Sequence, residues 1–367
     1  MNGCIESDKS ILDEIRAEIG TLKNNTHRIH ARTTSSLSIV GTDGGNNSLF
    51  FDPLSVHIIR VVDSDNRQYY MDVITPSSSV SELSNRVKQG GEHYDALKDL
   101  MNYFKVDKIT DITPMIKEPH KGESQNDSWI QVYREIVEWA TLFSLVRKGS
   151  VSSDTLFIFD GFLRSKIFRG DLFKKIKEGI EEGIERQRKE NNKRIYLVGL
   201  AKRSKVLERY QFAMHLDGIM EKNYPCYVEV PRDLEIKSYK WAEYARDEDL
   251  EGKEVNKFVA GKMFLVKFGK EKFDPIWPVD IFLSQKNDAQ QILGSLLNDA
   301  EMGFPVPFYP LSLQRAHDNA ALAGFDIEII QSEMLKSIEK VLGSDSDKVY
   351  SFFLRNKNVA AARYDKG

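Results

Sequence analysis

Apolar residues recur along this chain with two spacings, which predict alternating strands and helices. Short apolar runs bounded by Asn, Asp and Gly predict strands, and apolar residues three or four positions apart predict helices. Strands are expected first at 37–42, 56–62 and 68–74, where the intervening turn residues favour antiparallel pairing. Further strands are expected at 155–159 and 195–200. These two runs are apolar on both faces, which is typical of central strands buried on two sides.

Helical spacing covers most of the remaining chain. Helices are expected at 7–22, 80–104, 128–146, 170–190, 287–300, 311–323 and 327–342. Between about 225 and 285, short β-like pieces alternate with Pro, Gly and charged residues, which predicts either an inserted small β subdomain or an extension of the sheet. Strands followed by alternating helices and strands indicate an α/β fold with a mixed sheet flanked by helices.

Three sections are expected from this pattern. Residues 1–30 form an N-terminal extension, 31–323 a main domain that contains the β-rich insertion, and 324–367 a C-terminal helix and tail. The first helix carries an apolar stripe of Ile11, Leu12, Ile15 and Ile19. A stripe on a terminal helix packs on its own chain or on a partner, and we consider it a candidate partner contact.

Composition narrows the class of protein. With 41% hydrophobic residues in 367, the chain can bury a full core, which excludes a disordered chain. Its two cysteines exclude a zinc ribbon, and its net charge of −3 excludes a uniformly basic nucleic-acid binder. No apolar run reaches the roughly 20 residues that span a bilayer. Because the N-terminus also lacks the layout of a signal peptide, we expect a cytoplasmic protein without a membrane anchor.

The candidate chemistry lies in carboxylates beside strand ends. Asp43 and Asp160 each follow an apolar run and precede a glycine. A strand-ending turn explains either one alone, but in an open α/β sheet such ends meet at a ligand crevice. Glu135 or Glu138 on the helix at 128–146 could add a third acid. Close carboxylates favour a divalent cation with hard oxygen ligands, so a Mg²⁺ or Mn²⁺ site is expected.

A histidine and a basic cluster extend this site. His317 lies on a helix that begins after Pro310, and it could bind a metal or carry a proton. Lys202, Arg203 and Lys205 follow the strand at 195–200, at the same sheet end if the strands are parallel. Clustered cations there would neutralise a phosphate backbone. The chain lacks GxxxxGK[ST], GxGxxG, HExxH and GxSxG motifs, so an NTPase or a serine hydrolase has no support.

Four segments together resemble the NurA nucleases in content and order: TDGG at 42–45, FDGFL at 159–163, GLAKRSK at 199–205 and FYPLSLQRAHD at 308–318. The resemblance covers about 37–323 and implies an RNase H-like core that cuts DNA with Mn²⁺ or Mg²⁺. It also implies a homodimer docked on a hexameric HerA translocase. The implied metal and catalytic residues are Asp43, Asp160, His317 and a helix glutamate, for which we choose Glu138.

The sequence departs from the family pattern in two places. Gly45 stands where the first motif usually has serine, and Phe162 stands in the serine position of the second. Neither change removes a charged ligand, so activity is retained as an expectation while substrate fit near the metal is altered. The resemblance also implies a tyrosine in the site, for which Tyr196, Tyr210 and Tyr224 are candidates.

The sequence therefore predicts a metal-dependent DNA nuclease that works with a HerA-type ATPase in DNA end processing or anti-phage defence. Lys202, Arg203 and Lys205 are the expected DNA-binding residues. The alternative is a catalytically silent module that binds DNA or docks on the ATPase. A metal-dependent nucleotide phosphatase is a third hypothesis, for which no base-binding signature is present.

Overall fold

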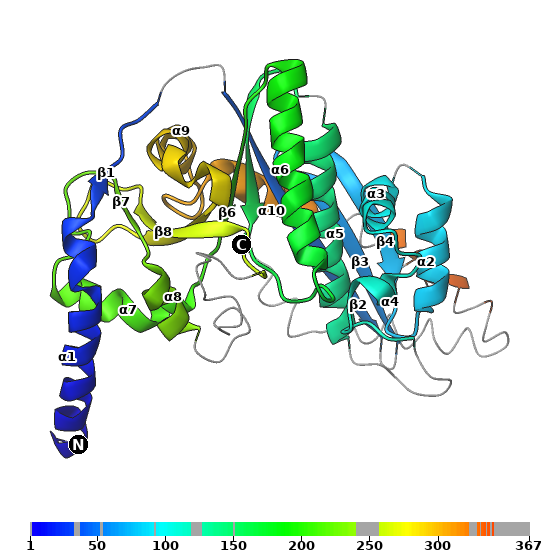
Figure 1. The fold of residues 1–367 in the computed structure, drawn as a ribbon. Coiled ribbons are helices and arrows are strands. Elements are labelled where there is room, and N and C mark those ends of the chain that lie inside the picture. The colour runs from blue at the N-terminus through cyan, green and yellow to red at the C-terminus, as the bar shows by residue number, and fades with distance from the viewer. Residues whose placement is uncertain are drawn as a thin grey trace.

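The computed structural model describes residues 2–32, 37–51, 54–91, 93–118, 127–149, 151–239 and 257–322, and parts of 329–340. Its described strands form one nine-stranded sheet in the order β1-β7-β8-β9-β6-β5-β2-β3-β4 (Figure 1). The strands are β1 His27–Arg28, β2 Leu37–Phe51, β3 Leu54–Asp63, β4 Gln68–Ile74, β5 Asp154–Asp160, β6 Ile195–Leu200, β7 Cys226–Glu229, β8 Gly261–Lys267 and β9 Ile276–Phe282.

The strand directions confirm the predicted mixed sheet. Strands β2, β3 and β4 are antiparallel neighbours, whereas β5 runs parallel to both β2 and β6. The order β4-β3-β2-β5-β6 with these directions is that of an RNase H-like fold. The β-rich region is an extension of this sheet, because β9 pairs antiparallel with β6, and β8 and β7 follow outward.

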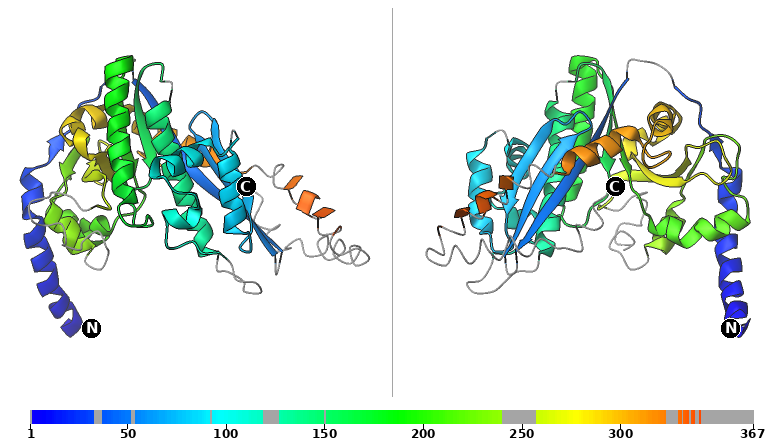
Figure 2. Two further views of the ribbon diagram at one scale, coloured as in Figure 1. Left: turned by 45° about the vertical axis from the view of Figure 1, so that its right-hand side comes forward. Right: turned by 180° about the vertical axis from the view of Figure 1, so that it is seen from behind.

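Helices cover both faces of the sheet (Figures 1 and 2). They are α1 Asn2–Asn24, α2 Val80–Gln89, α3 Asp95–Phe104, α4 Ile109–Ile112, α5 Ser128–Lys148, α6 Leu172–Asn191, α7 Lys205–Leu216, α8 Arg232–Ser238, α9 Ala289–Glu301 and α10 Leu311–Ala320. Along β5, Phe157 and Phe159 join the core under α5 and α6, whereas Leu156 and Ile158 join the core under α9. This alternation explains why β5 is apolar on both faces.

Two predicted boundaries were wrong. The helix expected at 80–104 is two helices, α2 and α3, because Gly90 with φ 77° ends the first one. The strand expected at 37–42 continues to residue 51, since its polar second half pairs with β3. The C-terminal helix expected at 327–342 lies partly outside the described residues. Within the described part of the chain, no helix is long and apolar enough to cross a membrane.

The apolar stripe of α1 belongs largely to the core of its own chain, which corrects the expectation of an exposed partner surface. Ile19 is fully buried in a cluster with residues of α7, and Leu12 and Ile15 pack against the same cluster. An ion pair between Arg16 and Asp217 adds to this contact at 2.6 Å. Ile11 alone among the four is exposed, at 55%.

We predict that Ile19→Ala lowers the free energy of unfolding by about 2–5 kcal/mol, because it opens a cavity in a buried cluster. The matched control Ile11→Ala removes the same atoms from an exposed position, where the expected change is within about 0.5 kcal/mol. Urea unfolding followed by circular dichroism measures both. Equal losses for the two variants would show that α1 does not pack as described.

Candidate metal centre

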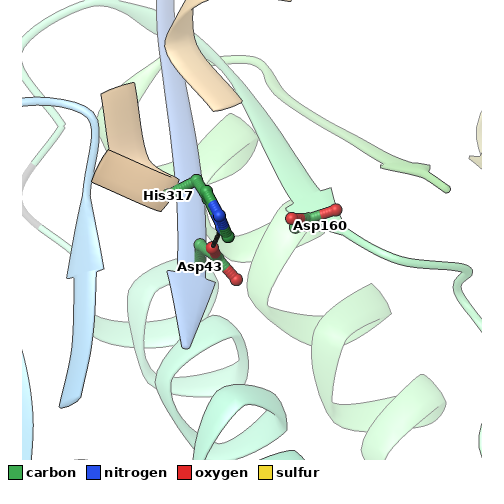
Figure 3. Close-up of side chains that lie close together, drawn as sticks. All are labelled: Asp43, Asp160 and His317. Atoms are coloured by element: carbon green, nitrogen blue, oxygen red, sulfur yellow. Dashed lines mark hydrogen bonds and ion pairs between the residues drawn. The ribbon is translucent and has the colours of Figure 1, made fainter. Parts of the chain in front are cut away.

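Asp43, Asp160 and His317 come together from three elements at the end of β5 (Figure 3). Asp43 lies on β2, Asp160 is the last residue of β5, and His317 lies on α10. Each side chain offers one ligand atom, and these atoms all lie within 4.8 Å of one another. A hydrogen bond of 2.8 Å joins His317 Nδ1 to Asp43 Oδ2. The structure thus brings together three of the four residues expected in the site.

The position of Asp43 differs from the expected one, because it lies within a strand rather than at its end. Parallel pairing of β2 with β5 stops at Thr42 and Phe159, and β2 then continues alone beside β3. The polar residues after Asp43 resemble a turn in composition, but their backbone groups are satisfied by the β3 ladder. Asp43 therefore faces the space beyond the end of β5, beside Asp160.

Glycines on β2 allow α10 to approach closely enough to bring His317 to Asp43. A Cβ atom at Gly41 would lie 2.6 Å from Ser312 O, and one at Gly45 would lie 2.5 Å from Ala320 O. Both atoms belong to the backbone of α10, which cannot move aside locally. Because side chains alternate along a strand, Asp43 shares this face with the two glycines. The face covered by α10 is consequently the face on which Asp43 meets His317.

Glu138 lies against the opposite face of β2, outside the group of three residues whose ligand atoms converge. A Cβ atom at Gly44 would lie 2.1 Å from Glu138 Oε1, so this carboxylate rests against the strand beside Asp43. Its side chain is 11% exposed and is paired with Arg134 at 3.2 Å. Glu135, the alternative third acid, accepts a hydrogen bond from Ser165 instead. Glu138 is therefore the glutamate that lies against the strand of Asp43.

Burial makes the charged forms of these acids costly. It raises the pKa of Asp43, and the charge of Asp160 adds to this, whereas the contact with His317 opposes it. Burial also raises the pKa of Glu138 well above its ordinary value; Arg134 opposes this, and the neighbouring carboxylates add to it. A positive charge between the acids would offset the repulsion that adds to the effect of burial on both pKa values.

Asp160 has a cation and a phenol as partners. Lys202 Nζ lies 3.2 Å from Asp160 Oδ2, and Tyr309 donates a hydrogen bond of 3.0 Å to Oδ1. Burial raises the pKa of Tyr309, and the charge of Asp160 raises it further, so the phenol remains a donor. Lys202, which was expected to bind DNA, forms an ion pair with Asp160 in this structure.

Sequence reasoning missed Tyr309, and the three tyrosines it proposed have other partners. Tyr196 accepts a hydrogen bond from Gln291, Tyr210 donates to Glu18, and Tyr224 lies under Arg28. One feature of the sequence could have identified Tyr309. Tyr309 directly precedes Pro310, and Pro310 is the N-cap of the helix that carries His317.

The two remaining basic residues expected at the DNA lie beside the acids. Arg203 and Lys205 line a cleft of about 550 Å³ that Asp160 and Glu138 also line. Lys205 is paired with Glu208 at 2.7 Å. Both cations are exposed, so they are accessible to a ligand in the cleft.

The donors present fit a divalent metal ion. Two aspartate oxygens and an imidazole nitrogen converge, and a nearly buried glutamate adjoins them. Carboxylates with one imidazole suit Mn²⁺ and Mg²⁺ better than thiolate-seeking ions.

Comparison with known proteins adds structural likenesses only. No protein-family model matches the chain, and no curated protein does. The crystal structure of the NurA nuclease from Sulfolobus solfataricus matches 94% of this chain and 99% of its own, with 12% identity and a TM-score of 0.43. A crystal structure of NurA with manganese matches 93% and 98%, with 11% identity and a TM-score of 0.40. NurA bound to dAMP and manganese matches 88% and 93%, with 11% identity and a TM-score of 0.38. Crystal structures of NurA nucleases are thus among the structural neighbours of this chain, and the match extends along nearly its whole length.

Proposed function

We propose that this protein is a divalent-metal-dependent DNA nuclease that hydrolyses phosphodiester bonds. The observation that carries the proposal is the convergence of Asp43, Asp160 and His317 within 4.8 Å at the end of β5. Acids and an imidazole so placed suit hydrolysis of a phosphate ester more than the binding of DNA alone. Exposed Arg203 and Lys205, on the adjoining cleft, support a polyanionic substrate.

The residues that would hold Mn²⁺ or Mg²⁺ are Asp43, Glu138, Asp160 and His317. When bound, such an ion activates a water molecule and stabilises the leaving oxygen of the phosphate. The chain itself fixes the acids, through the α10 contact on one face of β2 and Glu138 on the other. The imidazole of His317, hydrogen-bonded to Asp43, is placed either to bind the metal or to carry a proton. Lys202 holds Asp160 and is near enough to neutralise a phosphate oxygen.

We predict that Asp43→Asn and Asp160→Asn each lower the rate of DNA cleavage by at least roughly 10- to 100-fold. Mutation of a residue that merely supports a metal ligand already lowers metal affinity or activity by that factor. Neither variant should lose thermal stability without metal, because each removes a charge from a crowded site. Cleavage of linear DNA with Mn²⁺, Mg²⁺ or EDTA measures activity, and differential scanning fluorimetry measures stability.

The matched control for these variants is Asp65→Asn, in the exposed turn after β3. Wild type and this control should be stabilised by Mn²⁺, by about 2.7 kcal/mol at a metal concentration 100 times the Kd. Cleavage that needs no metal would contradict the proposed metal dependence. Unfolding of both site variants, with no stabilisation of the wild type by metal, would show that the acids have a structural role.

The third acid can be tested with a matched pair on one helix. We predict that Glu138→Gln abolishes most of the cleavage, because Glu138 rests against β2 beside Asp43. Glu135→Gln should keep activity within a few fold, since Glu135 is bound to Ser165. Initial cleavage rates at saturating Mn²⁺ decide between them, and the reverse ranking would assign the role to Glu135.

We further propose that the protein acts as a homodimer with a HerA-like hexameric ATPase that feeds it DNA, in end processing or phage defence. The sequence has no GxxxxGK[ST] loop of its own, and its net charge of −3 gives weak long-range attraction to DNA. A twofold assembly is the simplest way for one chain to enclose a DNA path. The exposed Ile11 end of α1 is the part of the apolar stripe left for such a contact.

We predict that a HerA-like ATPase with ATP increases DNA degradation at least tenfold over the protein alone, and that ATP without the ATPase has no effect. Analytical ultracentrifugation at micromolar concentration should show a dimer. A monomer whose full activity needs no ATPase would contradict this assembly.

A further inference from the structure

The cleft beside Asp160 contains aromatic rings as well as acids and cations. It has a volume of about 550 Å³ and lies between α5, the end of β5 and the segment entering α7. Phe162 and Tyr239 line it, together with Asp160 and exposed Arg203. A volume of this size is typical of pockets that enclose a small organic group, and a nucleotide is of that class.

The ring of Phe162 contacts a buried arginine that also lines the cleft. The guanidinium group of Arg164 lies over its ring, with Cζ 5.1 Å from the ring centroid. Arg164 is itself buried and bonded to Asp280 at 2.9 and 2.5 Å and to Glu235 at 3.3 Å. The Phe162 ring is half-buried, so it is not enclosed by the core. A ring that already has such a contact loses less conformational entropy when a ligand stacks on it than a freely exposed ring does.

The distance to the acids suits one nucleotide. Phe162 follows Asp160 by two residues, so their Cα atoms are at most roughly 7 Å apart. A phosphate at Asp160 would therefore place its own sugar and base near the ring. Arg203 forms no hydrogen bond or ion pair with any described residue, which leaves its guanidinium group available for the phosphate or the base.

We propose that this cleft is a subsite for one unpaired nucleobase, which stacks on Phe162 while its phosphate lies at the acids. The inference rests on the proposed nuclease function and specifies how the substrate is held. A base inside a duplex has both faces covered by its neighbours, so only a single-stranded or frayed segment can enter. Recognition by stacking is tolerant of sequence, because every base has a π-face.

The test is a cycle that removes the ring from the protein and the base from the DNA. Single-stranded oligonucleotides carry one abasic nucleotide at successive positions, and their binding is measured by fluorescence anisotropy with Ca²⁺ in place of Mn²⁺. For the wild type, one abasic position should weaken binding about 5- to 150-fold, the usual effect of losing one stacked base. Phe162→Leu should weaken binding of the intact strand by a similar factor and should be insensitive to that abasic position.

Two further variants separate stacking from packing. Phe162→Trp keeps a ring and should retain both affinity and base dependence. Phe212→Leu removes a ring from α7 that is 64% exposed and does not line the cleft, and it should change neither. Thermal unfolding checks each fold, and Leu is chosen over Ala at position 162 because it keeps the apolar contacts behind the ring.

The outcomes separate this inference from the nuclease proposal. Equal weakening of every oligonucleotide by Phe162→Leu, unchanged binding in that variant, or no DNA binding by the wild type would overturn the base subsite. Base-dependent binding that disappears in Phe162→Leu supports it. Cleavage with Mn²⁺ is measured separately, so an inactive protein with base-dependent binding would refute the nuclease and keep the subsite. An active nuclease in which Phe162→Leu leaves DNA binding and its base dependence unchanged would keep the nuclease proposal and refute the subsite.

Discussion

The geometry of the candidate site depends on the glycines of β2, which allow α10 to pack closely on one face of the strand and Glu138 of α5 on the other. Backbone atoms of α10 would lie within 2.6 Å of Cβ atoms at Gly41 and Gly45, and Glu138 occupies the space that a side chain at Gly44 would fill. Any larger residue on one face would push α10, and His317 with it, away from Asp43. On the other face it would displace Glu138. The positions that lack side chains thus fix where the charged ones meet.

The second constraint is electrostatic. Two of the groups of buried charges in the described part of the chain adjoin the same cleft, and they are balanced differently. Arg164 is enclosed by Asp280 and Glu235, a closed network in which the arginine has carboxylates as direct partners. At the site, by contrast, the ligand atoms of two carboxylates and an imidazole converge within 4.8 Å, and Glu138 with its partner Arg134 lies beside them. A stable fold can carry this imbalance when an external cation completes it, which is how an ion-binding site differs from a structural ion pair.

The fold was largely predictable because its strands differ sharply from its helices in apolar spacing. Runs such as 155–159 and 195–200 gave correct strands, and the fold class followed from their order. Errors arose where composition and pairing disagree. The polar stretch after Asp43 stays in β2 because β3 pairs with it, and a long-range partner is invisible to local spacing. The buried half of the α1 stripe has the same origin, since only the fold brings α7 beneath Ile19.

Site residues followed the same division. Asp160 and His317 were predicted because a strand end and a proline-started helix mark them locally, and the structure brings their side chains together. Tyr309 was missed because its contact with Asp160 depends on how the chain folds back before α10. The site lies where β2 loses one of its two neighbouring strands. Strand β2 continues beside β3 past the end of β5, and the space beyond β5 is a crevice. The acids occupy the β2 side of that crevice and Phe162 the side leading to α7. The nucleotide proposed above would therefore place its phosphate at the acids and its base on the ring.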